Sequence, residues 1–169
     1  MTPEEKSAYE ALRFIMPELE KRSLRWVITG GFACYVYGVP RKLTDIDIDI
    51  DTSKDTAAFK DLFACVSAHI TQPLIHFVDQ NNDNYNFEIT VAGQLIDICP
   101  MAELKVFDRN VAKYVAFYDG FPASEEGDFF GLKLPLLSKE LIIKNKEMYV
   151  WQRESDVADI AGLRALLPG

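Results

Sequence analysis

The sequence predicts an α/β (α+β) fold, in which helices pack on a mixed β-sheet and two further helices complete the C-terminal end. Three observations predict it. Helical and strand-like hydrophobic patterns alternate along the first part of the chain, residues 45–51 alternate strictly between Asp and Ile, and residues 138–167 carry two helical patterns in succession. The length of 169 residues is that of one domain. We expect a single domain over residues 1–169, with its core at about 24–100 and a C-terminal helical part at about 138–167.

The N-terminal part predicts a helix, a strand and a second helix. Residues 2–5 supply a capping Thr, a Pro at the first helical position and two acids in the first turn, and apolar residues then recur at helical spacing up to Leu19. Residues 25–28 predict a short strand, which the following glycines break. Residues 32–37 predict a short helix that ends at Gly38.

The middle of the chain is predicted to be rich in strands. Residues 45–51 form a strand with one apolar face, because their apolar residues recur with period two. Thr52 and Ser53 can cap the helix that follows. Further strands are expected at residues 74–78, 85–91 and 94–99. The last two form a hairpin. Residues 101–135 have the least defined pattern, and the acidic segment 124–128 predicts an exposed loop.

Two helices are predicted at the C-terminal end. Ser138 caps the first, which reaches about Trp151, and Ser155 opens the second. Lys144 lies at the edge of the buried face of the first helix, so its stem can lie on the core while its ammonium group reaches a cleft. Lys146 is expected to point further out. Lys144 could equally be an ordinary lysine at the boundary between core and surface.

The composition limits the classes of function. The net charge of −8 and the pI of 4.8 make non-specific binding to duplex DNA a poor candidate, because that binding depends on Lys and Arg. The sequence has neither a transmembrane run nor the apolar core of a signal peptide near its start. The three cysteines stand among apolar neighbours and are expected to be buried free thiols. We therefore expect a cytoplasmic protein without a membrane partner.

The strongest chemical signal is the row of aspartates at alternate positions of the predicted strand 45–51. Their side chains share one face, with neighbours roughly 7 Å apart, while the Ile side chains point the other way. Four like charges in a row repel one another, and Asp is disfavoured in strands. A divalent cation such as Mg²⁺ would turn this repulsion into coordination, because hard cations take carboxylate oxygens. The alternative is the solvated face of an edge strand, although such faces usually mix Thr, Lys, Glu and Ser.

Two further features lie near this row in the predicted fold. Gly30 and Gly31 stand at a strand-to-helix turn, where backbone N–H groups can approach phosphate oxygens, although two glycines can also form a simple turn. Asp97 is a carboxylate inside an apolar strand, which is costly unless it is paired or bound to metal. If its strand pairs with strand 45–51, the Ile residues of both reach one core and Asp97 joins the acidic face. Otherwise Asp97 is expected to pair with an Arg.

Together, these motifs resemble the polymerase-beta-type nucleotidyltransferase superfamily, in particular its small stand-alone members. The motif of that superfamily is Gly-Gly or Gly-Ser, a spacer, Asp-x-Asp and a later third carboxylate. The corresponding residues here are Gly30, Gly31, Asp45, Asp47 and Asp97. Residues 134–140 also resemble lincosamide nucleotidyltransferases, and residues 141–160 resemble a C-terminal pattern of the broader group. The resemblance covers about residues 24–165.

The resemblance implies an enzyme that moves a nucleoside monophosphate from an NTP to an acceptor hydroxyl and releases pyrophosphate. ATP is the expected donor and Mg²⁺ or Mn²⁺ the expected cofactor. Asp45, Asp47 and Asp97 are the implied catalytic and metal-binding residues, and Gly30, Gly31 and Lys144 the implied nucleotide-binding residues. In this scheme Asp97 also accepts the proton of the acceptor, and Lys144 stabilises the leaving pyrophosphate.

This sequence departs from the family pattern at two positions. Many members have Ser where Gly31 stands, and Ser155 occupies a position where Lys is common. Each change removes a contact that could hold phosphate or substrate. Arg41 and Lys42, just before the aspartate strand, could meet phosphates or could be surface charges.

Two other functions remain as alternatives. One is a catalytically silent nucleotidyltransferase fold that pairs with another protein, as in toxin–antitoxin pairs. The other is a divalent-cation-binding module that uses only the aspartate strand, although it lacks the loop pattern of an EF-hand. For an enzyme, the acceptor could be a small molecule, a protein side chain or an RNA end. A homodimer or a partner protein could complete the pocket, with residues 101–135 as the first place to look for it.

Overall fold

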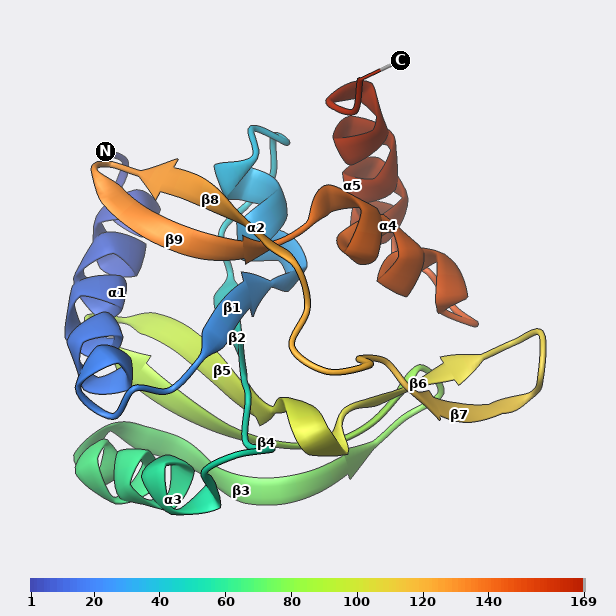
Figure 1. The fold of residues 1–169 in the computed structure, drawn as a ribbon. Coiled ribbons are helices and arrows are strands. Elements are labelled where there is room, and N and C mark those ends of the chain that lie inside the picture. Colours follow the sequence, from blue (N-terminus) through green and yellow to red (C-terminus); the bar gives the residue numbers. More distant parts are fainter. Residues whose placement is uncertain (169) are drawn as a thin grey trace.

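A computed structural model describes residues 1–168. Within these residues, five α-helices pack on a mixed nine-stranded sheet, and two of the helices form the C-terminal end, which confirms the predicted fold class (Figure 1). The helices are α1 (Pro3–Lys21), α2 (Gly30–Val36), α3 (Thr56–Cys65), α4 (Lys139–Met148) and α5 (Glu154–Ala165), with short 3₁₀ helices at Ser67–His69 and Met101–Glu103. The strands are β1 (Trp26–Thr29), β2 (Asp45–Ile50), β3 (Ile70–Val78), β4 (Asn82–Val91), β5 (Gln94–Pro100), β6 (Lys105–Asp108), β7 (Lys113–Ala116), β8 (Ser124–Phe129) and β9 (Leu132–Leu137).

The aspartate strand β2 lies in the middle of the sheet. The strand order is β7-β6-β4-β5-β2-β1-β9-β8, and β3 pairs with β4. β2 runs antiparallel to β1 and parallel to β5, in a register that sets Asp47 beside Asp97 and Ile46 beside Ile96. The predicted pairing of these two strands is therefore confirmed. Because side chains alternate along a strand, this register gathers the carboxylates on one face and the Ile side chains on the other.

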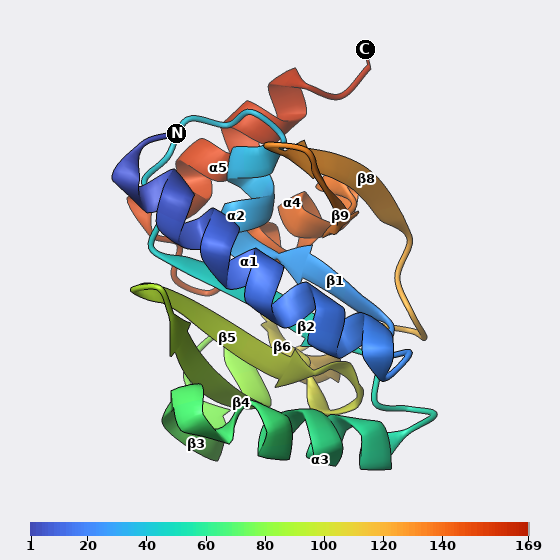
Figure 2. The same cartoon turned by 90° about the vertical axis from the view of Figure 1, so that its left-hand side faces the viewer.

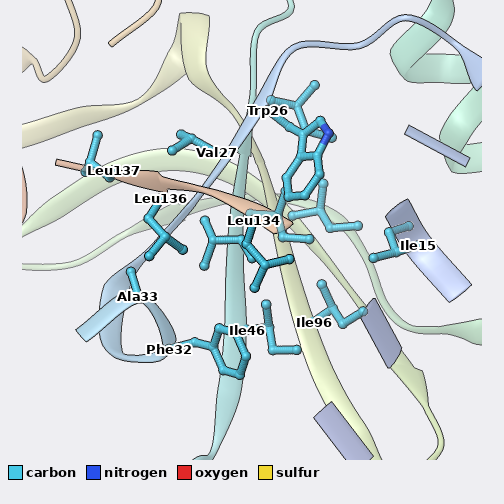
Figure 3. Packing of buried hydrophobic residues seen from close by; sticks show 14 of the residues in the cluster. Ile15, Trp26, Val27, Phe32, Ala33, Ile46, Ile96, Leu134, Leu136 and Leu137 are labelled. Atoms are coloured by element: carbon cyan, nitrogen blue, oxygen red, sulfur yellow. The ribbon is translucent and has the colours of Figure 1, made fainter. Parts of the chain in front are cut away.

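The apolar face of the sheet packs against α1 and α3, which lie across it in Figure 2. Ile15 of α1 lies near Ile46 and Ile96, all three fully buried (Figure 3). On α3, Phe59 packs edge-on against Phe87 of β4. α4 and α5 lie at the other end of the molecule from α3 (Figure 1). The opposite, polar face of the sheet is thus left to face α4.

Local signals place most element ends. Thr2 caps α1 through a capping box with Glu5, as its sequence predicts. The cap of α3 is Asp55, however, and the prediction of Thr52 or Ser53 is wrong. The backbone N–H and the hydroxyl of Ser53 both donate to the Asp51 carboxylate, which holds this segment in a turn and delays the helix.

Residues 101–135 contain more regular structure than their composition suggests. The expected exposed loop at 124–128 is wrong, because these residues belong to β8, which pairs with β9. Exposed acids alternate along β8 with residues that face inward, and Gly127 allows a close approach to Leu136.

Cys34 and Cys99 are buried free thiols, but Cys65 is exposed at the end of α3, so the expectation that all three are buried is wrong. Over the described residues, no helix combines the length and the apolar character needed to span a bilayer.

Candidate active site

The polar face of the sheet and α4 enclose a cavity of about 370 Å³. Strands β1 to β5 line one side, and residues of α4 and of the segment that follows it line the other. Five of the six predicted site residues line it: Gly30, Gly31, Asp45, Asp47 and Asp97. The fold therefore brings together groups that are up to 67 positions apart in the chain, because β1, β2 and β5 are neighbours in the sheet.

Four carboxylates form the wall of the cavity that we call the carboxylate row: Asp45, Asp47, Asp49 and Asp97. Three come from alternate positions of β2 and the fourth from β5. The last aspartate of the alternating sequence, Asp51, does not join the row. Its carboxylate pairs with Arg25 and accepts hydrogen bonds from Ser53, outside the cavity.

The members of the row differ in their partners. Asp97 accepts two hydrogen bonds from the amide of Asn86, at 2.9 and 3.0 Å, and Asp49 accepts one from the Tyr118 hydroxyl at 2.6 Å. Asp47 has no hydrogen-bond or ion-pair partner among residues 1–168. Tyr118 comes from residues 101–135, the segment expected to help complete the pocket, although no single residue of it was predicted for the site.

Burial and mutual repulsion disfavour the charged forms of these acids. Burial, followed by the neighbouring charges of the row, raises the pKa of Asp47 to about 8. Burial raises the pKa of Asp49 to about 7 although Tyr118 donates to it, and that of Asp97 to about 6 although Asn86 donates to it. The row is therefore an anionic site without enough positive charge around it.

The donor set of the row suits a hard divalent cation. Carboxylate oxygens are the ligands that Mg²⁺ and Mn²⁺ take, and the unpartnered carboxylate of Asp47 lies between its neighbours on the same face. No three His, Cys, Asp or Glu side chains in the described part of the chain are already gathered as a metal-ligand cluster. Two members of the row are instead turned towards Asn86 and Tyr118.

The glycine turn lies directly beside the row. Gly30 has a φ of +60°, and a Cβ at this position would collide with the carboxylate of Asp47. A Cβ at Gly31 would collide with the guanidinium of Arg41. Both glycines are therefore needed for close approach. A Ser in place of Gly31, as in many members of the superfamily that the sequence resembles, would displace the Arg41 guanidinium, which fills that space.

The cavity is also lined by a group that we call the cationic cluster: Arg41, Lys146 and Arg153, held by Asp156 and Asp159 of α5. The Lys146 ammonium lies 2.6 Å from Asp156 and 3.1 Å from Asp159. Burial opposes ionisation of Asp156, but hydrogen bonds from Arg153 and Lys146 outweigh it and hold its pKa well below the usual range. The three cations exceed the two acids by one charge.

The predicted position of Lys144 is not supported by the fold. Lys144 is exposed and lines a separate hollow near Asp108, whereas Lys146, expected to point outward, is buried in the cavity wall. The reason is that Asp156 and Asp159 receive its ammonium group, so a lysine can occupy the buried face of α4. Ser155 is also exposed and does not line the cavity, so the missing Lys there removes no cavity contact.

A further wall of the cavity consists of amides. Asn82, Asn84 and Asn86 alternate along β4 and all face the cavity; we call them the amide row. The predicted strand began at residue 85, so it left out Asn82 and Asn84, and no role was predicted for Asn86. The signal was present, since Asn recurs with period two from residue 82 onward.

A side chain added at Gly31 would compete with the Arg41 guanidinium for the same space, and this can be tested. Gly31→Ser should lower the free energy of unfolding by about 2 kcal/mol, because the guanidinium must leave its place beside Asp159. Urea unfolding of the variant measures this cost. In an Arg41→Ala background the same substitution should cost much less. An equal cost in both backgrounds would show that the two residues do not compete for space.

The raised pKa values of the row predict how stability depends on pH. The ordinary value for Asp is 3.8, so between about pH 4 and pH 8 the folded chain binds more protons than the unfolded chain. The free energy of unfolding should therefore fall as the pH rises from 5 to 8 in the absence of divalent cations. Urea unfolding at several pH values checks this, and Asp47→Asn should flatten the dependence. Stability that rises towards pH 8 would contradict the raised values.

No protein-family profile matches the sequence, and no curated protein matches it significantly. Similarity is found among solved structures. A candidate nucleotidyltransferase from Thermotoga maritima has a TM-score of 0.66 at 20% identity, over 81% of each chain. The lincosamide antibiotic adenylyltransferase LnuA, solved with lincomycin bound, has a TM-score of 0.56 at 17% identity, over 92% of this chain and 96% of that one. ANT(2″)-Ia, solved with adenylyl-2″-tobramycin, has a TM-score of 0.60 at 18% identity, over 94% of this chain and 88% of that one. The chain has the nucleotidyltransferase fold.

Proposed function

We propose that this protein with a nucleotidyltransferase fold is a metal-dependent enzyme that moves a nucleoside monophosphate from an NTP to an acceptor hydroxyl. The observation that carries the proposal is the placement of Asp47 beside Asp97, on neighbouring strands, in a cavity that also contains the glycine turn. ATP is the first donor to test, because two of the similar structures are adenylyltransferases by name or by bound product.

Asp45, Asp47 and Asp97 are the residues that would hold Mg²⁺ or Mn²⁺. Asp47 has no partner among the described residues, and the pKa of Asp97 is raised; both observations support this assignment, because both describe acids that lack compensating charge. When bound, the metal supplies positive charge that neutralises the triphosphate and orients it. Asp49, which Tyr118 already engages, is proposed to act in the outer shell.

The cationic cluster is the proposed partner of the triphosphate. Arg41 covers Gly31, so its guanidinium and the backbone N–H groups of the glycine turn are close together. Transfer of a nucleotidyl group needs positioned positive charge where the pyrophosphate leaves. We assign that role to Lys146 and Arg41 in place of Lys144.

Asp97 is the proposed general base. Two hydrogen bonds from Asn86 fix its carboxylate, and its pKa of about 6 lies close to neutral pH. A general base works best when its pKa is near the working pH, because it is then ionised and can still take a proton. Asn86 is the positioning residue in this scheme.

Isothermal titration with a non-hydrolysable analogue of each NTP tests the proposal, with and without Mg²⁺. Binding of at least one analogue that depends on Mg²⁺ is expected, and transfer of label from that NTP should follow when acceptors are supplied. Metal binding that is indifferent to the nucleotide would favour a cation-binding module. A lack of nucleotide binding at millimolar concentration would favour the silent partner protein and would reject the enzyme.

A further inference from the structure

The turn between β3 and β4 carries a buried amide that reaches the C-terminal part of the chain. Asn81 is only 8% exposed. Its Oδ1 accepts hydrogen bonds from the backbone N–H groups of Val150 and Trp151, at 2.9 and 3.4 Å, and its Nδ2 donates to the carbonyl of Trp151 at 3.1 Å. One side chain thus binds the backbone of two residues about 70 positions away. Asn81 does not itself line the cavity, so any effect on the site must pass through the residues that it holds.

The turn that carries Asn81 is itself fixed by hydrogen bonds. The carboxylate of Asp79 accepts from the backbone N–H groups of Asn81 and Asn82, at 2.8 and 2.7 Å. The carbonyl of Asn81 accepts from the N–H of Phe107 in β6 at 2.8 Å, and the hydroxyl of Tyr114 in β7 donates to the carbonyl of Asp79. A side chain that projects from so constrained a turn has little freedom to lose. Asn81 is therefore a fixed support for the backbone that it binds.

The segment that Asn81 holds, residues 149–153, joins α4 to α5 and forms part of the cavity wall. Tyr149 and Arg153 stand at its two ends, and both line the cavity. The two residues that bond to Asn81 lie between them, and each is more than half exposed, so burial of their apolar side chains does little to hold the segment. Gln152 adds one contact, a hydrogen bond of 2.7 Å to a carbonyl of α4. The position of this wall therefore depends on hydrogen bonds, and Asn81 makes three of them.

The segment also determines where two members of the cationic cluster stand. Arg153 donates to Asp156, and the same carboxylate binds the ammonium group of Lys146. A displacement of the segment would move Arg153 and change the partners of Asp156. Cations that are held in place before a ligand arrives bind it more tightly, because less freedom is lost on binding. Loosening this wall should therefore weaken the binding of a triphosphate.

We infer that Asn81 is a positioning residue for the nucleotide, which holds residues 149–153 so that Tyr149 and Arg153 remain in the cavity wall; this rests on the proposed function. The segment contains no member of the carboxylate row. Loss of the Asn81 amide should therefore reduce nucleotide affinity without changing the groups that carry out the transfer.

Isothermal titration of Asn81→Ala tests this inference. The ligand is the non-hydrolysable NTP analogue that binds the natural chain, with the ATP analogue tried first, in the presence of Mg²⁺ and well below the unfolding midpoint of the variant. The Kd should rise at least tenfold, while the number of sites per chain stays unchanged. A purely structural role would have the opposite signature, because a misfolded fraction lowers the number of sites and leaves the Kd of the folded fraction as it was. An unchanged Kd would overturn the inference.

Two control variants separate positioning from a general loss of stability. Asn110→Ala removes an exposed amide from the turn between β6 and β7. Leu62→Ala opens a cavity in the core beneath α3, which lies at the other end of the molecule from α4 and α5 (Figure 1). Leu62→Ala should lower the thermal unfolding midpoint at least as much as Asn81→Ala does, yet both controls should bind the analogue within twofold of the natural chain. If Leu62→Ala weakened binding as much as Asn81→Ala, lost stability would explain the effect and the inference would fail.

A double-mutant cycle with Arg153→Met tests whether Asn81 acts through the segment. In the natural chain, Arg153→Met should raise the Kd at least fivefold. In the Asn81→Ala background it should raise the Kd less than twofold, because Arg153 has already lost its fixed position. Equal factors in both backgrounds would show that Asn81 does not act through Arg153 and would overturn the inference. If the natural chain bound none of the NTP analogues, the proposed function itself would be rejected.

Discussion

Asp47→Asn is expected to reduce nucleotidyl transfer about a thousandfold or more, while the protein remains folded. The substitution preserves the shape of a side chain that lies against Gly30, and it removes a charge from the centre of the carboxylate row. Loss of a metal-binding carboxylate at a phosphoryl-transfer site removes ~4 kcal/mol of transition-state stabilisation. Initial rates with the NTP and acceptor identified by the labelling experiment measure the effect.

The same variant should be more stable than the natural chain when no divalent cation is present. Asp47 has neighbouring charges of its own sign and no described partner, so its neutral replacement relieves repulsion. We expect a gain of about 1 kcal/mol in the free energy of unfolding at pH 8 and little change at pH 5. A site that binds and reacts at the cost of stability has this signature.

Asp51→Asn is the matched control, because Asp51 ends the same alternating sequence. Its carboxylate pairs with Arg25 and Ser53 outside the cavity, so the variant should transfer nucleotide at a rate within twofold of the natural chain. Its stability should fall by about 1–2 kcal/mol, because it loses satisfied hydrogen bonds. Near-normal turnover by Asp47→Asn, or equal losses in both variants, would reject the role given to the row.

Lys146→Met is expected to have the largest effect on stability. Lys146 is 4% exposed, and its ammonium group lies between Asp156 and Asp159, each 1% exposed. Removing one partner of a buried ion pair leaves charge without compensation, at a cost of about 3 kcal/mol. Arg41 and Arg153 remain as partners of the two acids, so the chain should still fold. Urea unfolding gives the loss directly.

Lys144→Met is the comparison for Lys146→Met, because Lys144 lies two positions earlier on the same helix. Lys144 is exposed, so its stability should change by less than about 0.5 kcal/mol. Nucleotide affinity should fall for Lys146→Met and stay unchanged for Lys144→Met. If Lys144→Met weakened nucleotide binding instead, the assignment taken from the sequence motif would be correct and the cationic cluster would have no part in binding.

The centre of the fold could be predicted because it depends on local alternation. Residues 45–51 can form a strand only with all their Ile side chains on one face, and the Ile residues around Asp97 have the same period. Burying both sets in one core is sufficient to bring Asp97 to the acidic face, which the register of β2 and β5 confirms. The glycine turn could also be predicted, because the two glycines interrupt the sequence between two apolar segments.

The cations could not be predicted in the same way, because their places depend on residues far along the chain. The helical spacing of α4 favoured an apolar face with Lys144 at its edge, and nothing local indicated that Asp156 and Asp159 would receive Lys146. The position of Arg41 could not be predicted either, because it depends on Asp159 and on the absence of a side chain at Gly31. The amide row was missed because Asn is rare in strands, so its alternation carried little weight.

The ion pair between Arg41 and Asp159 joins residues 118 positions apart in the chain. During synthesis, the strands that bear the carboxylate row emerge from the ribosome before α5 does. A nascent chain at that stage therefore presents a concentrated anionic surface whose counterions come from the surrounding solution. Only after α5 emerges does the protein supply the charges that hold Arg41 and Lys146 in the cavity wall. Ionic strength should thus affect cotranslational folding more strongly than it affects the finished protein.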